Sequence, residues 1–401
     1  MTKVRIIIFI ITFLIVGLIG YFVSLYARGY RFNSKTFKFS PNGLLVVKSD
    51  PSGAQVFING ELKNATDTTI SLSPGTYDVE FKKEGFITWD KRLEITKEVV
   101  TEANAHLFKS VPSLTPVSFT GSISPVASLD FGRIAYAVPS TNTSGGGGLW
   151  ILDTANLPLG FAREPRQVTD GDMTNSTWQF SPDGRDIMLT TLTGVFVLDA
   201  GSFTPQKERI NVASQKVEIM VDWQNKSKLK LTAQLKGIQP EIADVLQRKT
   251  KFLIFSPDEK KVLYQASSDA TVPSGVAKQL PGASTQRQER EIKEGRTYIY
   301  DIKEDRNFLI YDQEVNIDSS LAVLDSPQAS IHWFSTSSNL VLAEEGKVTI
   351  MDYDGTNRQV VYSGAYITPY AFPILSTDRI IILTNLGATD SLPNLYAVTI
   401  K

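Results

Sequence analysis

Residues 6–26 form a run without a single charged side chain, IIIFIITFLIVGLIGYFVSLY. As an α-helix at ~1.5 Å per residue, this run reaches about 31 Å, which matches the hydrocarbon core of a bilayer. Tyr21 and Tyr26 lie near one end, where amphipathic aromatic rings favour the membrane interface. We therefore predict a transmembrane helix over residues 6–26, preceded by a short tail over residues 1–5 and followed by a juxtamembrane linker over residues 27–41.

A cleaved signal peptide is the alternative interpretation of this segment. The apolar part of a signal peptide is normally shorter and ends in small residues before the cleavage site. Here the run ends in the bulky pair Leu25 and Tyr26, followed by Ala27. We therefore expect an uncleaved signal anchor, with membrane lipid as its partner.

The charges beside the helix do not fix its orientation. Two basic residues precede the helix and four follow it: Lys3, Arg5, Arg28, Arg31, Lys35 and Lys38. The larger number after the helix favours a cytoplasmic C-terminal body, whereas the basic N-terminus favours an exported one. The orientation therefore has to be inferred from the rest of the chain.

The composition limits the chemistry open to the chain. Its 401 residues are enough for two or three domains with buried cores. The net charge of −1 gives no field that would collect nucleic acid. There is no cysteine, so disulfides and thiolate metal sites are excluded, and a multi-histidine centre is not expected from two histidines, His106 and His332. We expect neither a cofactor nor a bound metal.

Residues 42–109 show the pattern of a small all-β module. Short apolar or alternating runs are separated by Asn-Gly and Pro-Gly turn signals. In the run TYDVEFKKEGF, the residues Tyr77, Val79 and Phe81 alternate with charged residues. This alternation is typical of a strand with one face buried and one face in water. We therefore predict a small β-sandwich over residues 42–109.

This module resembles the PEGA domain family, a β-sandwich named for a Pro-Glu-Gly-Ala run. The chain has Pro51-Ser52-Gly53-Ala54 at the corresponding place, and LSPGTYDVEFKKEGFITWDKRLEI follows in the family's order. The resemblance implies a module of the bacterial or archaeal cell envelope that lies outside the cytoplasm and acts as a spacer or binding module. The family has no catalytic residues, and we interpret the run itself as a turn that positions the next strand.

Beyond this module the chain repeats itself. The run SVPSLTPVSFTGSISP, at residues 110–125, has no helical pattern and is predicted to be a linker. The run WQFSPDGRDIMLT is then echoed by FLIFSPDEKKVLYQ and more weakly by IHWFSTSSNLVLAE. Each echo is typical of strand, turn and strand, and each is followed by a short apolar strand that ends in aspartate.

The spacing of these strand ends is that of β-propeller blades. The strands end at Asp153, Asp199, Asp301, Asp352 and Thr399. Successive intervals are 46, 102, 51 and 47 residues, of which the second is about two periods. A four-stranded blade repeats every ~40–50 residues, and blades stack around an axis because one blade cannot bury both faces alone. We predict a mainly β chain in which residues 110–401 form a propeller of five or six blades.

The long interval leaves the blade count open. It holds a polar insertion at residues 266–296 and the passage VEIMVDWQNKSKLKLTAQLKGIQPEIADVLQRKT, at residues 217–250, which has strand-like ends. One helix is predicted at residues 240–248, which begin with proline and glutamate. The interval is either a sixth blade or an excursion from a five-bladed ring. The SPDG turns and MDYDGTNRQVVY resemble the WD-like repeats of TolB-type propellers.

No motif assembles a catalytic, cofactor or metal site. Asp352, Asp354 and Gly355 begin like a calcium loop, but the glutamate of such a loop does not follow, so an Asx turn is expected. Residues 144–148, SGGGG, lack the lysine and helix of a phosphate loop and are interpreted as a hairpin tip. His332 alternates with apolar neighbours in a predicted strand and is interpreted as structural.

Three further features of the sequence lack the surroundings of a catalytic site. His106 has no acidic neighbour in the sequence. The run QRQEREIKEGR, at residues 286–296, mixes charges of both signs, which is typical of a solvated loop or frayed helix. The Ser-Pro turns lack the Gly-x-Ser-x-Gly elbow of a hydrolase. We therefore predict no catalytic residues.

Two functions from different classes remain open. The first is a membrane-anchored, extracytoplasmic, non-enzymatic scaffold of the cell envelope, with the PEGA-like module as a spacer and the propeller as a platform for a protein or glycan partner. The alternative is a propeller-based hydrolase or lyase acting on surface polymers, which would need titratable groups converging in the central channel. The sequence offers no such pair, so we expect the binding function. An inward-facing sensor is a third interpretation, which follows the flanking charges.

Overall fold

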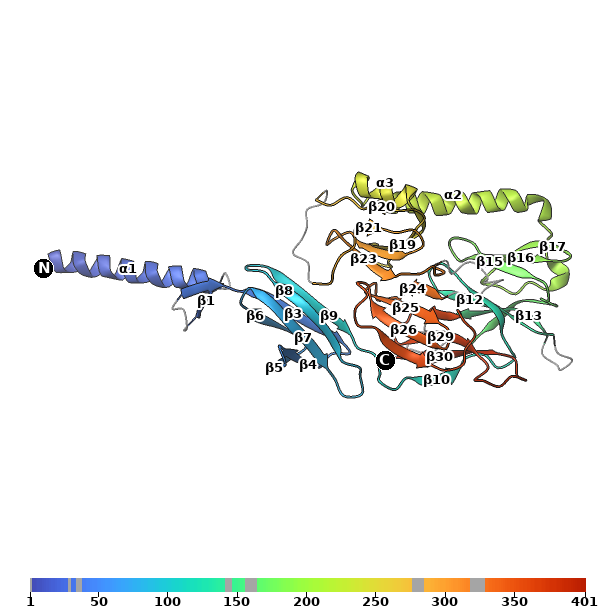
Figure 1. Cartoon of the computed structure of the whole chain (residues 1–401), viewed down its shortest axis with the longest axis horizontal. Coiled ribbons are helices and arrows are strands. Elements are labelled where there is room, and N and C mark those ends of the chain that lie inside the picture. The colour runs from blue at the N-terminus through green and yellow to red at the C-terminus, as the bar shows by residue number, and fades with distance from the viewer. Residues whose placement is uncertain are drawn as a thin grey trace. The chain divides into compact units, whose positions relative to one another are not determined.

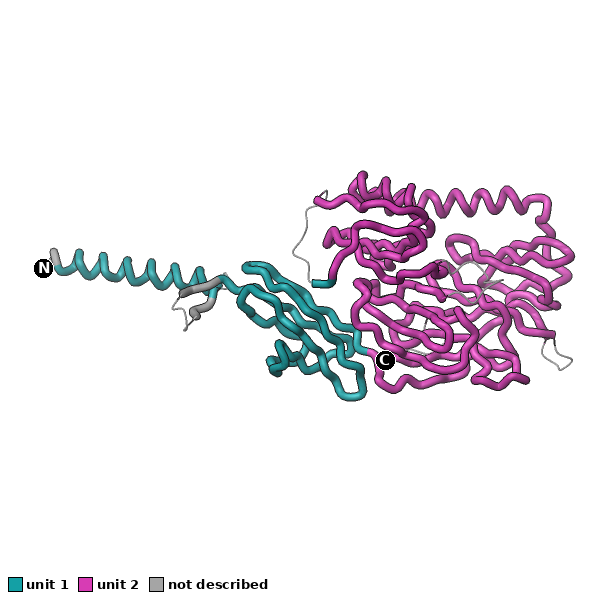
Figure 2. The backbone as a smooth tube through the Cα atoms, in the orientation of Figure 1, with its two compact units in different colours: residues 1–107, 280–286 teal, residues 108–279, 287–401 magenta. Residues whose placement is uncertain are grey.

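The computed structural model describes residues 2–27, 30–33, 38–140, 146–155, 164–275, 285–317 and 329–401. The chain forms two compact units (Figure 2): residues 1–107 with 280–286, and residues 108–279 with 287–401. Leu107 is buried in the core of the first unit, and the next residue, Phe108, is buried in a core cluster of the second unit.

The N-terminal helix α1 (Thr2–Ala27) contains the predicted apolar run. The span Val4–Ala27 reaches a mean hydropathy of 3.0, and its most apolar window is entirely exposed. Its length and composition suit a membrane-spanning segment and equally a signal sequence. Strands β1 (Tyr30–Asn33) and β2 (Lys38–Pro41) pair antiparallel within the expected linker.

The first unit continues as two sheets that share one core. One sheet has the order β6-β3-β9, in which β3 and β9 run parallel, and the other has the order β5-β4-β7-β8. Side chains alternate between core and surface along β3, and buried residues of both sheets meet in one cluster. The strands are β3 (Gly43–Asp50), β4 (Gln55–Ile58), β5 (Glu61–Ala65), β6 (Thr68–Leu72), β7 (Gly75–Lys82), β8 (Trp89–Ile95) and β9 (Val100–His106).

The predicted alternation along β7 is confirmed. Val79 and Phe81 are fully buried, and the ring of Phe81 stacks on that of Trp89 at 5.0 Å. On the wet face, the Asp78 carboxylate accepts a hydrogen bond from Arg92 Nε at 2.7 Å. Burying each large apolar side chain contributes about 1.5–3 kcal/mol, so the buried face of β7 holds the two sheets together.

Among its described residues, the second unit has five antiparallel sheets of three or four strands, named A to E here (Figure 1). Sheet A consists of β11 (Ile123–Ala127), β12 (Arg133–Val138), β13 (Gly148–Asp153) and β14 (Arg166–Asp170). Sheet B consists of β15 (Thr177–Phe180), β16 (Asp186–Thr191) and β17 (Gly194–Asp199). Sheet C consists of β18 (Thr250–Phe255), β19 (Lys261–Ala266), β22 (Thr297–Asp301) and β23 (Arg306–Tyr311). Sheet D consists of β24 (Ser330–Trp333), β25 (Asn339–Glu344), β26 (Lys347–Asp352) and β27 (Gln359–Ser363). Sheet E consists of β28 (Ala371–Pro373), β29 (Arg379–Thr384), β30 (Asn394–Thr399) and β10 (Ser113–Pro116).

The prediction of a linker at residues 110–125 is wrong. Strand β10 lies within this stretch and pairs antiparallel with β30, near the opposite end of the chain. Strand β11, which opens sheet A, also begins within it. Proline and serine are compatible with a strand at the edge of a sheet, where the missing N–H of proline need not face a neighbouring strand. The composition of a linker and that of an edge strand therefore look alike.

Each sheet of the second unit buries both of its faces. Along β29, Ile380 and Ile382 join a cluster shared with sheet D, whereas Ile381 and Leu383 join a cluster shared with sheet A. Along β12 and β25, successive side chains likewise point to opposite faces of the sheet and join two different clusters. The sheets therefore pack in the order B, A, E, D, C.

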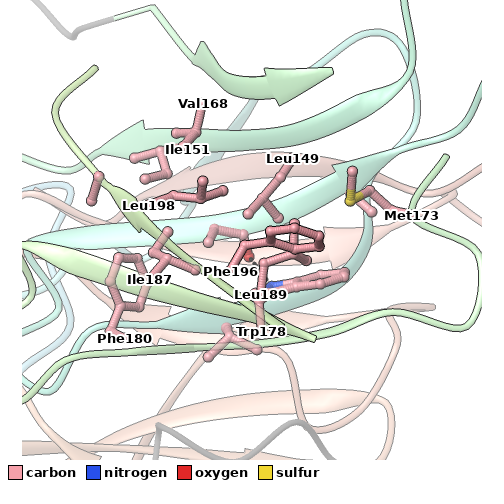
Figure 3. Close-up of a cluster of buried hydrophobic side chains, with 14 residues drawn as sticks. Leu149, Ile151, Val168, Met173, Trp178, Phe180, Ile187, Leu189, Phe196 and Leu198 are labelled. Atoms are coloured by element: carbon pink, nitrogen blue, oxygen red, sulfur yellow. Dashed lines mark hydrogen bonds between the residues drawn. The ribbon is translucent and has the colours of Figure 1, made fainter. Parts of the chain in front are cut away.

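The contact between sheets A and B illustrates this packing (Figure 3). Its cluster combines side chains of β13 and β14, including Leu149 and Val168, with side chains of β15 to β17, including Trp178 and Phe196. The Trp178 indole also donates a hydrogen bond to the Ala135 carbonyl of sheet A, at 3.3 Å.

Of the strand-like ends expected for residues 217–250, the first is wrong, whereas β18 begins at the last. The first part of this passage forms helix α2 (Lys216–Leu235), preceded by the short 3-10 helices η2 (Gln206–Glu208) and η3 (Ala213–Gln215). The predicted helix at residues 240–248 is confirmed as α3 (Pro240–Arg248), with proline in its first turn. Within the described residues, the long interval supplies helices and the short pair β20 (Ala270–Thr271) and β21 (Glu291–Ile292), and no sixth sheet of three or four strands.

Helix α2 connects the two end sheets of the series. In its first half, Trp223 packs against Met188 and Val195 of sheet B. At its end, Leu235 joins helix α3 in covering the Val262 and Tyr264 face of sheet C. Between these contacts, all side chains of residues 224–230 are exposed. Figure 1 shows α2 running from sheet B toward α3.

Candidate functional site

The turns between the first two strands of sheets A, B and C share one hydrogen-bonding pattern. In each turn a serine hydroxyl donates to an aspartate two residues on, at 2.6–2.7 Å, and accepts from the backbone N–H five residues on, at 3.0 Å. The serine and aspartate pairs are Ser128 and Asp130, Ser181 and Asp183, and Ser256 and Asp258. These serines serve as turn residues, because their hydroxyls already hold the backbone.

The first of these turns was missed in the sequence. Its residues read Ser128-Leu129-Asp130, without the proline that marks the other two turns. A search for serine, any residue and aspartate ahead of an apolar strand would have found it, since the two side chains and not the proline make the hydrogen bonds.

The strand-ending aspartates close the neighbouring turns. Asp153 accepts hydrogen bonds from Nε of Arg133 and of Arg166, both at 3.2 Å. Asp301 is buried, which raises its pKa, and it accepts the backbone N–H of Glu304 at 2.8 Å. These carboxylates therefore hold the fold at the strand ends.

The Asx turn expected at Asp354 is confirmed. Its carboxylate accepts both the backbone N–H and the hydroxyl of Thr356, at 3.3 and 2.6 Å. The two oxygens of Asp352 accept side-chain amides of Asn339 and Asn357, each at 3.0 Å. The carboxylates that resemble a calcium loop in the sequence therefore accept hydrogen bonds from neighbouring residues of the protein.

Three carboxylates gather at one end of sheet B. Burial raises the pKa of Asp186, and the charges of Asp183 and Asp199 raise it further, whereas Lys226 of α2 opposes this shift. The Asp199 carboxylate accepts the backbone N–H of Gly201 at 2.7 Å. A raised carboxyl pKa is typical of catalytic acids, but here two of the three carboxylates are committed to turns.

His332 lies in β24, which is buried along its whole length. Its ring centroid is 5.2 Å from that of Phe131, on the turn that follows β11 of sheet A. Burial lowers the pKa of His332 to about 4, so the imidazole is neutral at neutral pH. The side chain packs as an aromatic ring between two sheets that are not neighbours in the series.

A buried ion pair lies beside sheet C. Arg290 Nη2 is 3.0 Å from Oδ1 of Asp305, whose side chain is fully buried. The Tyr300 hydroxyl donates to the same Asp305 oxygen at 2.9 Å, and Arg290 also donates to the backbone carbonyls of Pro273 and Asp305. The other oxygen, Oδ2, has no hydrogen-bond partner among the described residues.

The expectation that residues 286–296 are a solvated loop or frayed helix therefore holds only for part of this run. The Arg290 side chain is 11% exposed, and the run contains strand β21. Mixed charge in the sequence did not indicate which residue would be buried. Of the predicted hairpin tip at residues 144–148, Ser144 and Gly145 lie outside the described residues, and Gly148 opens β13.

The first unit places two predicted features close together. The Pro51 to Ala54 run forms the bend between β3 and β4, and Lys83 Nζ donates to the Ser52 carbonyl at 2.7 Å. His106, without an acidic neighbour in sequence, lies with Nδ1 3.7 Å from Oδ2 of Asp50, because β3 and β9 pair in parallel. The run positions a strand, as predicted.

Comparison with known proteins agrees with the first resemblance. Residues 42–110 match the PEGA domain family. No curated protein matches the chain.

Solved structures give distant matches over much of the chain. A putative TolB from Agrobacterium tumefaciens is 12% identical, with 69% of this chain and 78% of that one covered and a TM-score of 0.24. TolB from Acinetobacter baumannii is 11% identical with a TM-score of 0.20, and the match covers 81% of this chain but only 59% of that one. A Carbohydrate-Active Enzymes Family AA12 protein from Trichoderma reesei is 8% identical, with 73% and 97% covered and a TM-score of 0.30. Likenesses at this level say nothing about what this chain binds or does.

Proposed function

We propose that this chain is a membrane-anchored binding protein of the cell envelope, with both folded units outside the cytoplasm and without catalytic activity. The bulky end of the apolar run in α1 supports retention of the anchor. The PEGA match supports export, because the resemblance implies an envelope module. The second unit would hold a protein or glycan partner through loops at one end of its sheets.

We further infer that sheets A to E form a five-bladed ring, with α2 across the interval where a sixth blade would stand. Support comes from the clusters that join the sheets in the order B, A, E, D, C and from the contacts of α2 with both end sheets. Pairing of β10 with β30 ties the first strand of the unit to its last. Such a ring leaves only short edges exposed.

The observation that carries the non-catalytic function is that the fully or nearly fully buried groups Asp305, Asp352 and His332 are committed to the fold. Asp305 pairs with Arg290, both Asp352 oxygens accept amide groups, and His332 is held neutral against Phe131. An enzyme would need a base, acid or nucleophile facing open space, with a second group to orient it. We identify no such pair among the described residues, and this supports the binding function over the hydrolase or lyase alternative.

Binding without turnover tests the proposal. Purified full-length chain in detergent is incubated with isolated cell-wall polymer and sedimented, and the supernatant is assayed for released reducing ends and peptides. We expect the chain to sediment with the polymer while release stays at the level of a blank without protein. Heat-denatured chain is the control for non-specific sedimentation. Release that grows with time and with protein concentration would contradict the proposal and favour the enzyme.

A further inference from the structure

The proposed function leaves the basic residues that follow α1 unexplained. Residues 27–49 contain five lysine or arginine residues and no aspartate or glutamate, in a chain whose net charge is −1. If the folded units are exported, this positive stretch lies on the side of the membrane where the positive-inside rule does not place it. A local role for these charges at the membrane surface resolves this conflict.

A pair of strands within this stretch begins next to the membrane span. We call the antiparallel pair of β1 (Tyr30–Asn33) and β2 (Lys38–Pro41) the juxtamembrane ribbon. Helix α1 ends at Ala27, and Cα atoms in sequence lie ~3.8 Å apart, so β1 begins at most about 11 Å from the end of the helix. The headgroup layer beside the hydrocarbon core is about 5–8 Å thick. The ribbon therefore starts in this layer or directly on it.

The strand register gives the ribbon one apolar face. Tyr30 pairs with Pro41, and Phe32 pairs with Phe39. Paired positions in an antiparallel ribbon lie on the same face, and so do positions two apart along a strand. These four positions therefore share a face, and none of them is charged.

The other face of the ribbon is polar and basic. Arg31 pairs with Ser40, and Asn33 pairs with Lys38, so two of its four positions are basic. A segment with one apolar face and one basic face is typical of elements that lie in the plane of the membrane interface. There the apolar face enters the boundary of the acyl chains, and the basic residues attract anionic headgroups.

The end of the ribbon next to α1 is tied to the β-sandwich. The Tyr30 hydroxyl donates to the Glu98 carboxylate at 3.1 Å. The backbone N–H of Glu98 donates to the carbonyl of Asn42, the residue after β2, at 3.1 Å. Glu98 belongs to the turn between β8 and β9. A segment that is held in place in advance loses less entropy on binding, which favours its contact with the membrane.

We propose that the juxtamembrane ribbon lies in the membrane interface and that Arg31 and Lys38 bind the phosphates of anionic lipid headgroups. This inference rests on the retained anchor of the proposed function. Because the ribbon is covalently joined to the span, the bilayer surface is the partner always within its reach, and the positive charge selects anionic lipid over neutral lipid. The basic residues after α1 then serve as a lipid contact and need not mark a cytoplasmic side.

Lipid quenching of single labels tests the proposal. Full-length F39C and S40C variants are each labelled with an environment-sensitive fluorophore, at one site per chain because the chain has no cysteine of its own. They are reconstituted into nanodiscs that contain a lipid with a quencher in its acyl chain. The two positions are neighbours on β2 but lie on opposite faces of the ribbon, so each is the matched control of the other. In an equal mixture of phosphatidylcholine and phosphatidylglycerol, we expect several-fold stronger quenching for F39C than for S40C.

A second comparison tests the headgroup contact. Quenching of labelled F39C should be stronger in the mixed discs than in discs of phosphatidylcholine alone, and adding R31Q and K38Q should remove this difference. Adding K48Q and K82Q instead neutralises two exposed lysines of the β-sandwich and should leave the difference unchanged.

Two results would overturn the proposal. One is equal quenching at the two labelled positions, and the other is the same response to both pairs of charge substitutions. Chain that does not remain with the discs would contradict the anchor itself, and with it this inference. Failure of the anchor is therefore distinguishable from failure of the ribbon alone.

Discussion

Replacing Arg290 with leucine is expected to lower the free energy of unfolding of the second unit by about 3–5 kcal/mol. The substitution leaves the fully buried Asp305 carboxylate without its counter-charge and removes the donor to two backbone carbonyls. The tyrosine hydroxyl of Tyr300 alone cannot replace a guanidinium as a partner for that charge. Urea unfolding of the full-length chain in detergent, followed by intrinsic fluorescence, measures the loss.

Arg296 provides the matched control for this experiment. Its guanidinium lies 3.5 Å from Glu289, and both side chains are more than a third exposed. Replacement of Arg296 with leucine should therefore cost no more than about 1 kcal/mol. A double variant R290L/D305N should be more stable than R290L, because it also removes the unpaired charge. Equal losses for R290L and R296L would show that Arg290 is not a structural partner.

Acidification is expected to destabilise the second unit through His332, by up to about 3 kcal/mol. Burial lowers the pKa of this histidine to about 4 in the folded protein, whereas an unfolded histidine has a value of about 6.5. Between these values the unfolded chain binds a proton that the folded chain does not, so stability is complete above pH ~6.5 and falls as the pH is lowered toward 4. Urea unfolding at several pH values measures the slope.

The variant H332L isolates this contribution. Carboxylates also titrate as the pH falls, so the relevant quantity is the difference between the parent chain and the variant. We expect the variant to have a shallower fall between pH ~6.5 and 4, with the packing against Phe131 largely kept. Parallel slopes for H332L and the parent would mean that His332 is accessible to protons in the folded state.

Local patterns predicted much of the fold because they act over a few residues. The alternation along β7 and the helix α3 were both predicted from sequence, and each has the side chains that its period requires. Helix α2 was missed for a physical reason. Most of its side chains face water, and only Trp223 and Leu235 are buried, so the apolar period of a packed helix is absent.

Most of the other wrong predictions concern residues whose partners lie far away in the sequence. Strand β10 looks like a linker because its partner β30 lies at the far end of the chain. The same limit applies to the Arg290 and Asp305 pair, since nothing local distinguishes Arg290 from its charged neighbours. The period of the strand ends left five or six blades open, and the described residues of the second unit form five sheets of three or four strands.

Labelling of a single cysteine in intact cells tests the central claim most directly. The variant S202C carries one exposed thiol on the second unit of an otherwise cysteine-free chain. With the body exported and α1 retained, a membrane-impermeant maleimide should label this thiol in unbroken cells, and the labelled chain should sediment with the membranes. Labelling that occurs only after lysis, or labelled chain in the soluble fraction, would contradict an exported and anchored protein.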